Sequence, residues 1–240
     1  QYKLSFAERV GPHNVQWFIS HWWGTAFQDT CSAIERHAKS FCKLPEQDAW
    51  MSLSYWICTF ANNQHCIREE LGQTHRESPF YLALHSDTCC GTCMILDQRA
   101  VPLTRSWCLF ELLQTMKLET RSEHQGLVFG TSTGVLNKGD ATVELALQIG
   151  HRLAVLSLKD ATATTVKDQQ MIESLVLKEM GTFAEIDQQL RDHVQAALRN
   201  CKHVVDDNFQ GMFEHLQAKD GGMFEHQAKD EDGDLNSATA

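Results

Sequence analysis

The chain has 240 residues, of which 42% are hydrophobic and 22% are charged, as is typical of a globular protein. This length is near the upper end for a single hydrophobic core, so we expect one domain with appendages. The formal net charge is −10, and neither a cluster of Lys and Arg nor a long apolar run is present, which argues against a nucleic-acid surface and a membrane span.

Nine cysteines are an odd number, and most of them fall within apolar runs, as Cys31, Cys58, Cys93 and Cys108 do. A secreted disulfide scaffold is shorter and richer in loops. No succession of basic, apolar and small residues of the signal-peptide kind follows Gln1. We therefore expect reduced thiols and an intracellular, cytoplasmic protein.

Five short apolar runs recur along the chain and are continuous rather than alternating, as expected of strands that are covered on both faces. They are residues 17–19, 55–58, 93–96, 127–129 and 153–156. Stretches with helical periodicity separate them, in units of roughly thirty to forty residues. This alternation predicts a three-layer α/β fold around a five-stranded parallel sheet.

The first long helix is expected after Gly24, where Thr25 and Gln28 have the spacing of a capping box. Its apolar residues recur at intervals of three and four and are Phe27, Cys31, Ile34, Ala38 and Phe41. Further along, Asp140 is expected to cap a helix that ends at Gly150.

The last part of the domain is expected to be helical. A polar loop at residues 161–165 leads into a helix with the apolar residues Ile172, Leu175 and Val176. Thr182 and Glu185 then have capping-box spacing at the start of another helix. One face of that helix carries Phe183, Ile186, Leu190, Val194, Ala197 and Cys201.

The helical pattern fails after this face. The sequence GMFEHLQAKD from Gly211 is nearly repeated from Gly222, and the acidic run DEDGD follows it. A two-copy repeat of this length is too short for a solenoid. We divide the chain into a lead-in at residues 1–14, an α/β domain at residues 15–205, and a flexible acidic tail at residues 206–240 that is disordered or docks on a protein partner.

In an open parallel sheet, ligands bind beyond the carboxyl ends of the strands, so the loops that leave the first three strands are the candidate site. The first loop, SHWWGT, places His21 before Trp22 and Trp23 at a helix start. The two indoles form an aromatic platform for a flat anionic ligand such as a nucleotide, or they wedge between helix and sheet; the two interpretations weigh equally. The second loop offers Asn62 and Asn63, although turn chemistry alone explains this pair.

The third loop begins at Asp97 and leads into the segment SWCLFELL. Pro102 disfavours helix before this segment, and Ser106 is a suitable N-cap. The expected apolar face comprises Leu109, Leu112, Leu113 and Met116. Trp107 and Glu111 lie one turn apart on the opposite face. A lone helical glutamate is ordinarily solvated, but a cleft shared by an indole and a carboxylate explains this pair better.

The sequence gives little support for a redox dithiol, a zinc site or a phosphate-binding loop. The segment from Cys90 to Cys93 has redox-dithiol spacing, but it precedes a strand rather than opening a helix, which favours burial. Histidines and cysteines do not show the tight spacing of a zinc motif, and a glycine-rich phosphate loop is absent from the sequence. We therefore expect no metal.

The segment SWCLFEL resembles the Trp-Cys-x-x-Glu-Leu helix start of Toll/interleukin-1 receptor (TIR) domains, especially those of plant type. WFISHWWG stands where that family has its first strand and the following loop, and the resemblance covers roughly residues 15–201. It implies a flavodoxin-like fold with the first strand between the second and the third. The loop at residues 62–72 departs from the family pattern, which is often small or glycine-rich there.

Many TIR domains cleave NAD between ribose and nicotinamide, using the helix glutamate and an aromatic side chain near the first-strand loop. Carried over by position, these are Glu111 and either Trp22 or Trp23, with Trp107 and Cys108 from the same motif beside them. The resemblance implies an NADase with NAD as its substrate, activated by self-assembly into a homo-oligomer through TIR-like surfaces. Other TIR domains are adaptors, so a non-catalytic interaction module is the alternative, and a nucleotide sensor without turnover is a third.

Overall fold

The computed structural model describes residues 3–225, apart from the side chains of residue 68 and residues 218–225. The strands are β1 (Trp17–Ser20), β2 (Tyr55–Ile57), β3 (Thr92–Ile95), β4 (Leu127–Thr131) and β5 (Gly134–Val135). The α-helices are α1 (Phe6–Val10), α2 (Phe27–Phe41), α3 (Cys58–Ala61), α4 (Ile67–Glu70), α5 (Pro79–Leu84), α6 (Ser106–Leu118), α7 (Val143–Ala154), α8 (Val166–Met180) and α9 (Phe183–Glu225). Short 3-10 helices are η1 (Ala49–Ser52), η2 (Val101–Thr104), η3 (Leu136–Lys138) and η4 (Leu158–Asp160).

The sheet has the order β2-β1-β3-β4-β5, and its first four strands are parallel. The predicted α/β class and flavodoxin-like strand order are therefore confirmed. β1 lies between β2 and β3, with Ile19 opposite Ile57 on one side and Cys93 on the other. The connection that leaves β1 runs outward to β2, whereas the one that leaves β3 runs the other way to β4, so the strand order reverses between β1 and β3. Ligands bind in the crevice at such a point.

The fifth strand is not the one predicted. β5 is a two-residue strand that pairs antiparallel to β4, whereas residues 153–156 form the end of α7 and the turn after it. α7 also runs past Gly150, the expected stop. A Cβ atom at Gly150 would lie 3.0 Å from Leu198 Cδ1, so glycine here lets α7 approach α9 closely. The apolar residues 153–156 are an amphipathic helix end, with Leu153 buried and Val155 exposed.

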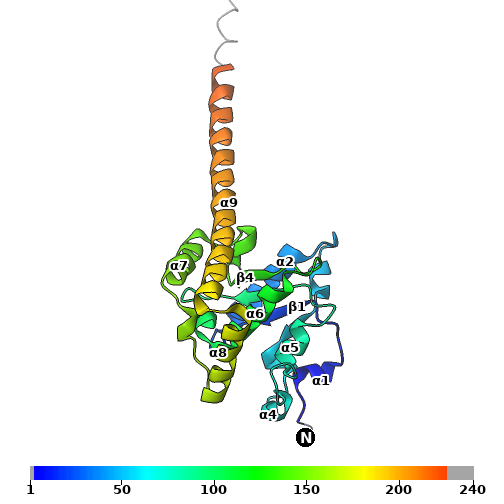
Figure 1. Ribbon diagram of the computed structural model, residues 1–240. Helices are drawn as coiled ribbons and strands as arrows, with labels where there is room; N and C mark the ends of the chain where they lie inside the picture. Colours follow the sequence, from blue (N-terminus) through cyan, green and yellow to red (C-terminus); the bar gives the residue numbers. More distant parts are fainter. Residues whose placement is uncertain (1–2, 226–240) are drawn as a thin grey trace, which may run out of the picture.

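Helices cover both faces of the sheet, which makes the three layers (Figure 1). α2 lies against one face, where Trp17 and Ile19 pack with Ala33. α6 lies against the other face, between the sheet and helices α5 and α8. Because alternate residues of a strand share a face, Phe18 and Ser20 of β1 point toward the α6 side.

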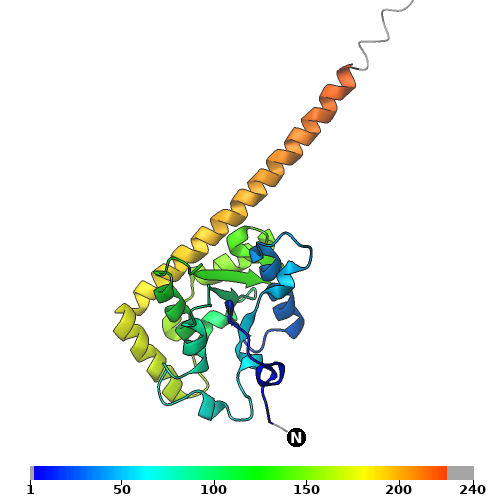
Figure 2. The same ribbon diagram turned by 90° about the vertical axis from the view of Figure 1, so that its right-hand side faces the viewer.

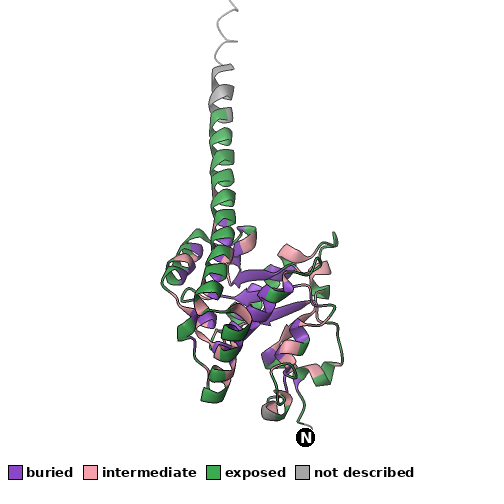
Figure 3. Cartoon of the chain, viewed as in Figure 1, coloured by how far each residue is buried: buried purple, intermediate pink, exposed green. Residues whose placement is uncertain are grey.

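α6 is enclosed on nearly all sides, which corrects the expectation of one buried face. Its buried residues are Ser106, Cys108, Leu109, Phe110, Glu111, Leu112, Leu113, Gln114, Thr115, Met116 and Leu118. The expected apolar face is therefore buried, but so is the opposite one. The purple interior of the cartoon in Figure 3 shows this helix within the core.

The buried face of α2 is rotated from the predicted one. Thr30, Ala33, His37 and Ala38 are buried, whereas Phe27 and Cys31 are exposed. His37 is tolerated inside because its Nδ1 is hydrogen-bonded to the Tyr55 hydroxyl at 2.9 Å and its ring packs on Phe41. A histidine with one ring nitrogen hydrogen-bonded therefore occupies a position that the apolar pattern assigned to solvent, although its Nε2 has no partner among the described residues.

Of the predicted caps, only the last forms. Thr182 Oγ1 accepts the amide of Glu185, whose carboxylate accepts the amide of Thr182 in return. Thr25 does not cap α2, and Ser106 is the first residue of α6 rather than its cap. Asp140 instead accepts the amide of Val135 and so holds the β5 turn, leaving Thr142 at the start of α7.

The predicted C-terminal helices are confirmed. Ile172, Leu175 and Val176 of α8 are buried, as are Ile186, Leu190, Val194, Ala197 and Cys201 of α9. Residues 206–225, assigned to the tail, continue α9 as a helix that projects from the domain in two perpendicular views (Figures 1 and 2). The remainder of the proposed tail, residues 226–240, lies outside the described residues.

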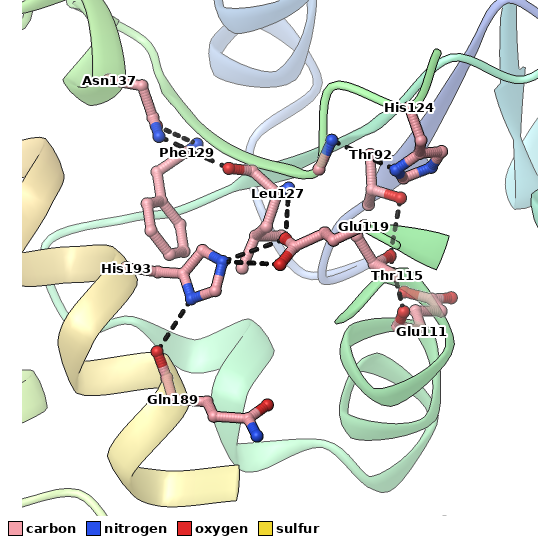
Figure 4. Close-up of polar contacts among 11 residues, drawn as sticks. Thr92, Glu111, Thr115, Glu119, His124, Leu127, Phe129, Asn137, Gln189 and His193 are labelled. Carbon is pink, nitrogen blue, oxygen red and sulfur yellow. Dashed lines mark hydrogen bonds and ion pairs between the residues drawn. The ribbon is translucent and has the colours of Figure 1, made fainter. Parts of the chain in front are cut away.

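A polar network joins the end of α6 to α9 (Figure 4). The Glu119 carboxylate contacts His193 Nε2 at 2.9 and 3.1 Å and accepts the amide of Leu127, at the start of β4, at 3.1 Å. The hydrogen bond with Glu119 raises the pKa of His193. One carboxylate thus connects a strand, the core helix and the C-terminal helix.

Candidate functional site

A pocket of about 360 Å³ lies beyond the carboxyl ends of β1 and β2, against the first turns of α6. This is the edge of the sheet at which the sequence placed the candidate site. Its lining comprises His21, Trp22, Trp23, Cys58, Asn62, Ile67, Leu71, Phe80, Arg105, Trp107, Cys108, Glu111, Thr162 and Thr164. Seven of the nine residues singled out from the sequence are among them.

Glu111 is the acidic group of the pocket. The residue is only 4% exposed, yet it lines the cavity, and its Oε2 atom has no hydrogen-bond partner among the described residues. Burial raises the pKa of the Glu111 carboxyl to about 8, against the smaller opposing effect of the Ser20 hydroxyl and the Cys108 thiol nearby. An unpartnered buried carboxyl is costly, so its presence calls for a functional explanation.

The backbone of Glu111 is held firmly beneath this side chain (Figure 4). Thr115 Oγ1 donates to the Glu111 carbonyl at 2.7 Å, and the same hydroxyl is hydrogen-bonded to Thr92 Oγ1 at 2.7 Å. Thr92 begins β3, so the chain of hydroxyls ties α6 to the central sheet. The position of the carboxyl is therefore fixed by the core rather than by a surface loop.

Aromatic side chains form much of the pocket wall. Trp107 stacks on Phe80 with ring centroids 5.0 Å apart. Trp23 Nε1 donates to Cys58 Sγ at 3.0 Å, which orients this indole although the residue is 57% exposed. The Trp22 ring folds over Gly24, where any Cβ atom would overlap it. Both tryptophans of the loop therefore line the cavity, and the wedge interpretation does not describe them.

Two further polar side chains reach the pocket with unused hydrogen-bonding atoms. His21 Nε2 is hydrogen-bonded to Thr59 Oγ1 at 3.0 Å, but its Nδ1 is buried without a partner in the described part of the chain. Burial lowers the pKa of His21, which favours the neutral ring. Asn62 Nδ2 is likewise buried and unpartnered. With Glu111, these atoms offer hydrogen bonds to a ligand.

Asn63 and Asp97 do not belong to the pocket. The Asn63 amide donates to Lys3 O at 2.9 Å and to the Glu8 carboxylate at 3.0 Å, which fastens the N-terminal segment to the domain. Asp97 Oδ1 accepts the amide of Val101 at 2.9 Å and so begins η2. Both side chains have structural partners, because a strand end needs turn residues as well as ligand contacts.

Half of the lining residues were not predicted from the sequence. Arg105 supplies a cation beside the SWCLFELL motif, and its position next to that motif was a usable signal. Thr162 and Thr164 arrive from the loop before α8, which is held by hydrogen bonds of Thr162 to Thr104 and Ser106. The local sequence of this loop shows no such pairing, so only the folded chain reveals it.

No protein-family model matches the chain, and no curated protein or solved structure matches it. Among residues 3–225, no helix is both long and apolar enough to span a bilayer. The same residues contain no group of three or more His, Cys, Asp or Glu side chains placed to hold a metal ion. All nine cysteines lie in the described part of the chain as free thiols, and Cys93 is fully buried in β3.

Proposed function

We propose that this protein is a TIR-like NAD nucleosidase whose catalytic group is Glu111. The observation that carries the proposal is a buried, unpartnered carboxyl at the mouth of the sheet, in a pocket walled by Trp22, Trp23 and Trp107. Such a concave apolar site with a few convergent polar groups and a perturbed pKa has the usual features of an active site.

The reaction fits the groups present. The bond between ribose C1′ and the pyridinium nitrogen breaks, and its electron pair leaves with nicotinamide, which becomes neutral and needs no acid. The ribose develops oxocarbenium character, and the ionised Glu111 stabilises this positive charge and accepts hydrogen bonds from the ribose hydroxyls. Water then adds to C1′ and releases a proton, giving ADP-ribose. The aromatic walls exclude other water and strengthen the electrostatic effect.

Subsites can be assigned from chemistry. The flat nicotinamide suits an indole face, and His21 and Asn62 have free atoms for its carboxamide. Arg105 stands at the same pocket and suits the pyrophosphate, which carries the negative charge of the ligand. The adenine end extends from the pocket toward solvent, because about 360 Å³ is small for a whole dinucleotide.

The experiment follows nicotinamide release from NAD at high protein concentration. We expect release by the wild-type chain and its loss in Glu111→Gln, with Glu144→Gln as a matched control because Glu144 is exposed on α7, outside the pocket. Release that persists in Glu111→Gln, or no release by the wild-type chain at any pH, contradicts the proposal.

The pH profile adds a second test. The working form of Glu111 in this mechanism is ionised, so kcat/KM is expected to rise with pH with a midpoint near 8. A profile that is flat from pH 6 to 9 would argue that another group stabilises the ribose.

Binding without turnover is the second candidate, and the raised pKa of Glu111 favours it. A protonated carboxyl donates a hydrogen bond but does not stabilise a cation. Calorimetry with NAD and ADP-ribose distinguishes this sensor from the enzyme, because the sensor binds both and leaves NAD intact.

The TIR resemblance also underlies our proposal that the active form is intracellular and self-assembled. Specific activity is then expected to rise with protein concentration. Constant specific activity over that range contradicts assembly-dependent activation.

A further inference from the structure

The part of α9 that projects from the domain carries an apolar stripe of its own. The stripe comprises Phe209, Met212, Phe213 and Leu216, which are 50%, 54%, 53% and 61% exposed. At ~100° per residue, these four positions fall within an arc of about 100° on one side of the helix. Figure 3 draws this part of the projecting helix in green, the colour of exposed residues.

Such a helix is not expected to be stable alone. Most helical stability in proteins comes from packing an amphipathic face, and isolated helices of this length are marginal in water. Within the domain, α9 packs through Leu190, Val194, Ala197 and Cys201, which are all buried. From residue 206 to residue 217 the helix has the same kind of apolar face, but every residue is exposed.

We propose that the apolar stripe pairs with the stripe of a second copy of this chain, so that the protein dimerises through the projecting part of α9. The charges on the helix permit a copy of itself as the partner. Lys202 pairs with Asp206, and His203 lies 3.2 Å from Asp207, so these acids have partners within their own helix. Glu214 accepts a hydrogen bond from Gln210. A symmetric pairing therefore does not need a partner of opposite charge.

The internal repeat recurs at a spacing close to a whole number of helical turns. Gly211 and Gly222 begin the two copies, eleven residues apart, and eleven residues advance a helix by three turns plus only about 20°. The helical backbone of α9 reaches Glu225, so positions 223 and 224 share the face of positions 212 and 213. Only the methionine and one phenylalanine of the stripe recur, because the positions eleven residues after Phe209 and Leu216 are Asp220 and Gln227.

The surface area that the two stripes can bury determines how strongly two copies are expected to dimerise. A large apolar side chain has roughly 200 Å² to bury, so four half-exposed ones offer roughly 400 Å² per chain and roughly 800 Å² in a symmetric pair. This falls short of the ~1,200 Å² of a stable interface, so the pairing is expected to be weak. We therefore expect a monomer–dimer equilibrium that responds to concentration.

The test is sedimentation velocity of the full chain across a wide concentration range, with reductant present because the cysteines are free thiols. Phe209→Glu/Leu216→Glu is expected to weaken dimerisation by on the order of 100-fold, since two buried apolar side chains are lost. Asn208→Glu/His215→Glu adds the same charge at exposed positions of the same helix outside the stripe and is expected to dimerise as the wild-type chain does. Thermal unfolding confirms that each variant retains the folded domain.

Three results would overturn the proposal. One is a wild-type chain that stays monomeric at every concentration. Another is a dimer that both double variants weaken equally, or neither weakens, because the interface then lies elsewhere. The third is a monomer that binds neutral phosphatidylcholine vesicles through the stripe, because a lipid surface is then its partner. Glu111→Gln is expected to leave dimerisation unchanged, so this proposal does not depend on the NAD-cleaving activity.

Discussion

Replacing Glu111 by glutamine is expected to stabilise the protein at neutral and alkaline pH while it abolishes activity. In the unfolded chain this carboxyl titrates near pH 4.5, whereas burial raises its pKa to about 8 in the folded chain. Between these values the folded state holds a proton that the unfolded state has lost. The wild-type free energy of unfolding therefore falls as pH rises from about 4.5 to about 8, and it is constant beyond that.

The size of the effect follows from the two pKa values. Each unit of pKa difference corresponds to ~1.4 kcal/mol, so the carboxyl costs about 5 kcal/mol at pH 8 relative to pH 4.5. Water entry and relaxation around the carboxylate reduce this figure, so a few kcal/mol is a realistic measured value. Glutamine has a similar volume and no titration, so the Glu111→Gln variant lacks this pH dependence. A group held at such a cost is expected where function requires it.

The measurement is chemical denaturation of both proteins at several pH values between 4.5 and 9. The difference in unfolding free energy, variant minus wild type, is expected to grow steadily with pH and to level off above about 8. Glu144→Gln removes a carboxyl at an exposed position and controls for the change in net charge. A difference that stays constant with pH would show that Glu111 is already ionised in the folded protein, and the reasoning would fail.

Three further outcomes are expected. Gly24→Ala displaces the Trp22 ring and is expected to weaken NAD binding several-fold with little loss of stability, as calorimetry and thermal unfolding would show. His193→Gln is expected to lower the free energy of unfolding below pH 6.5, because only the protonated ring forms an ion pair with Glu119. The difference from wild type is expected to fade as pH rises through the raised pKa of His193. A difference that grows with pH in chemical denaturation would contradict this. Ile186→Ala is expected to cost about 2–4 kcal/mol in chemical denaturation because the side chain is fully buried.

Local rules predicted those features that depend on a single element. The four parallel strands followed from continuous apolar runs, and the core face of α9 from its three-and-four spacing. The capping box of Thr182 and Glu185 needed only residues three apart. Glu111 was found because it stands one turn from Trp107 in a helix that follows the loop after β3.

Predictions from local sequence failed where a residue distant in the chain packs against a segment and changes its secondary structure or its buried face. Residues 153–156 are apolar enough for a strand, but they form the end of α7 and the turn after it. The fifth strand of the sheet is instead β5, whose turn is held by the side chain of Asp140. The buried face of α2 includes His37, because the Tyr55 hydroxyl from β2 is hydrogen-bonded to Nδ1 of that ring. Neither partner can be identified from the sequence near the residue it affects.

By itself, the sequence determined the layered α/β architecture, the edge of the sheet where a ligand would bind, and the acidic and indole groups placed there. These depend on strand order, helix periodicity and short spacings, which local chemistry specifies. Only the tertiary structure decided that α6 is enclosed, that Arg105 and the loop of Thr162 complete the pocket, and that the Glu111 carboxyl is buried without a partner. Burial and long-range pairing arise from packing of distant segments, and the pKa that gives this site its chemistry arises from that packing.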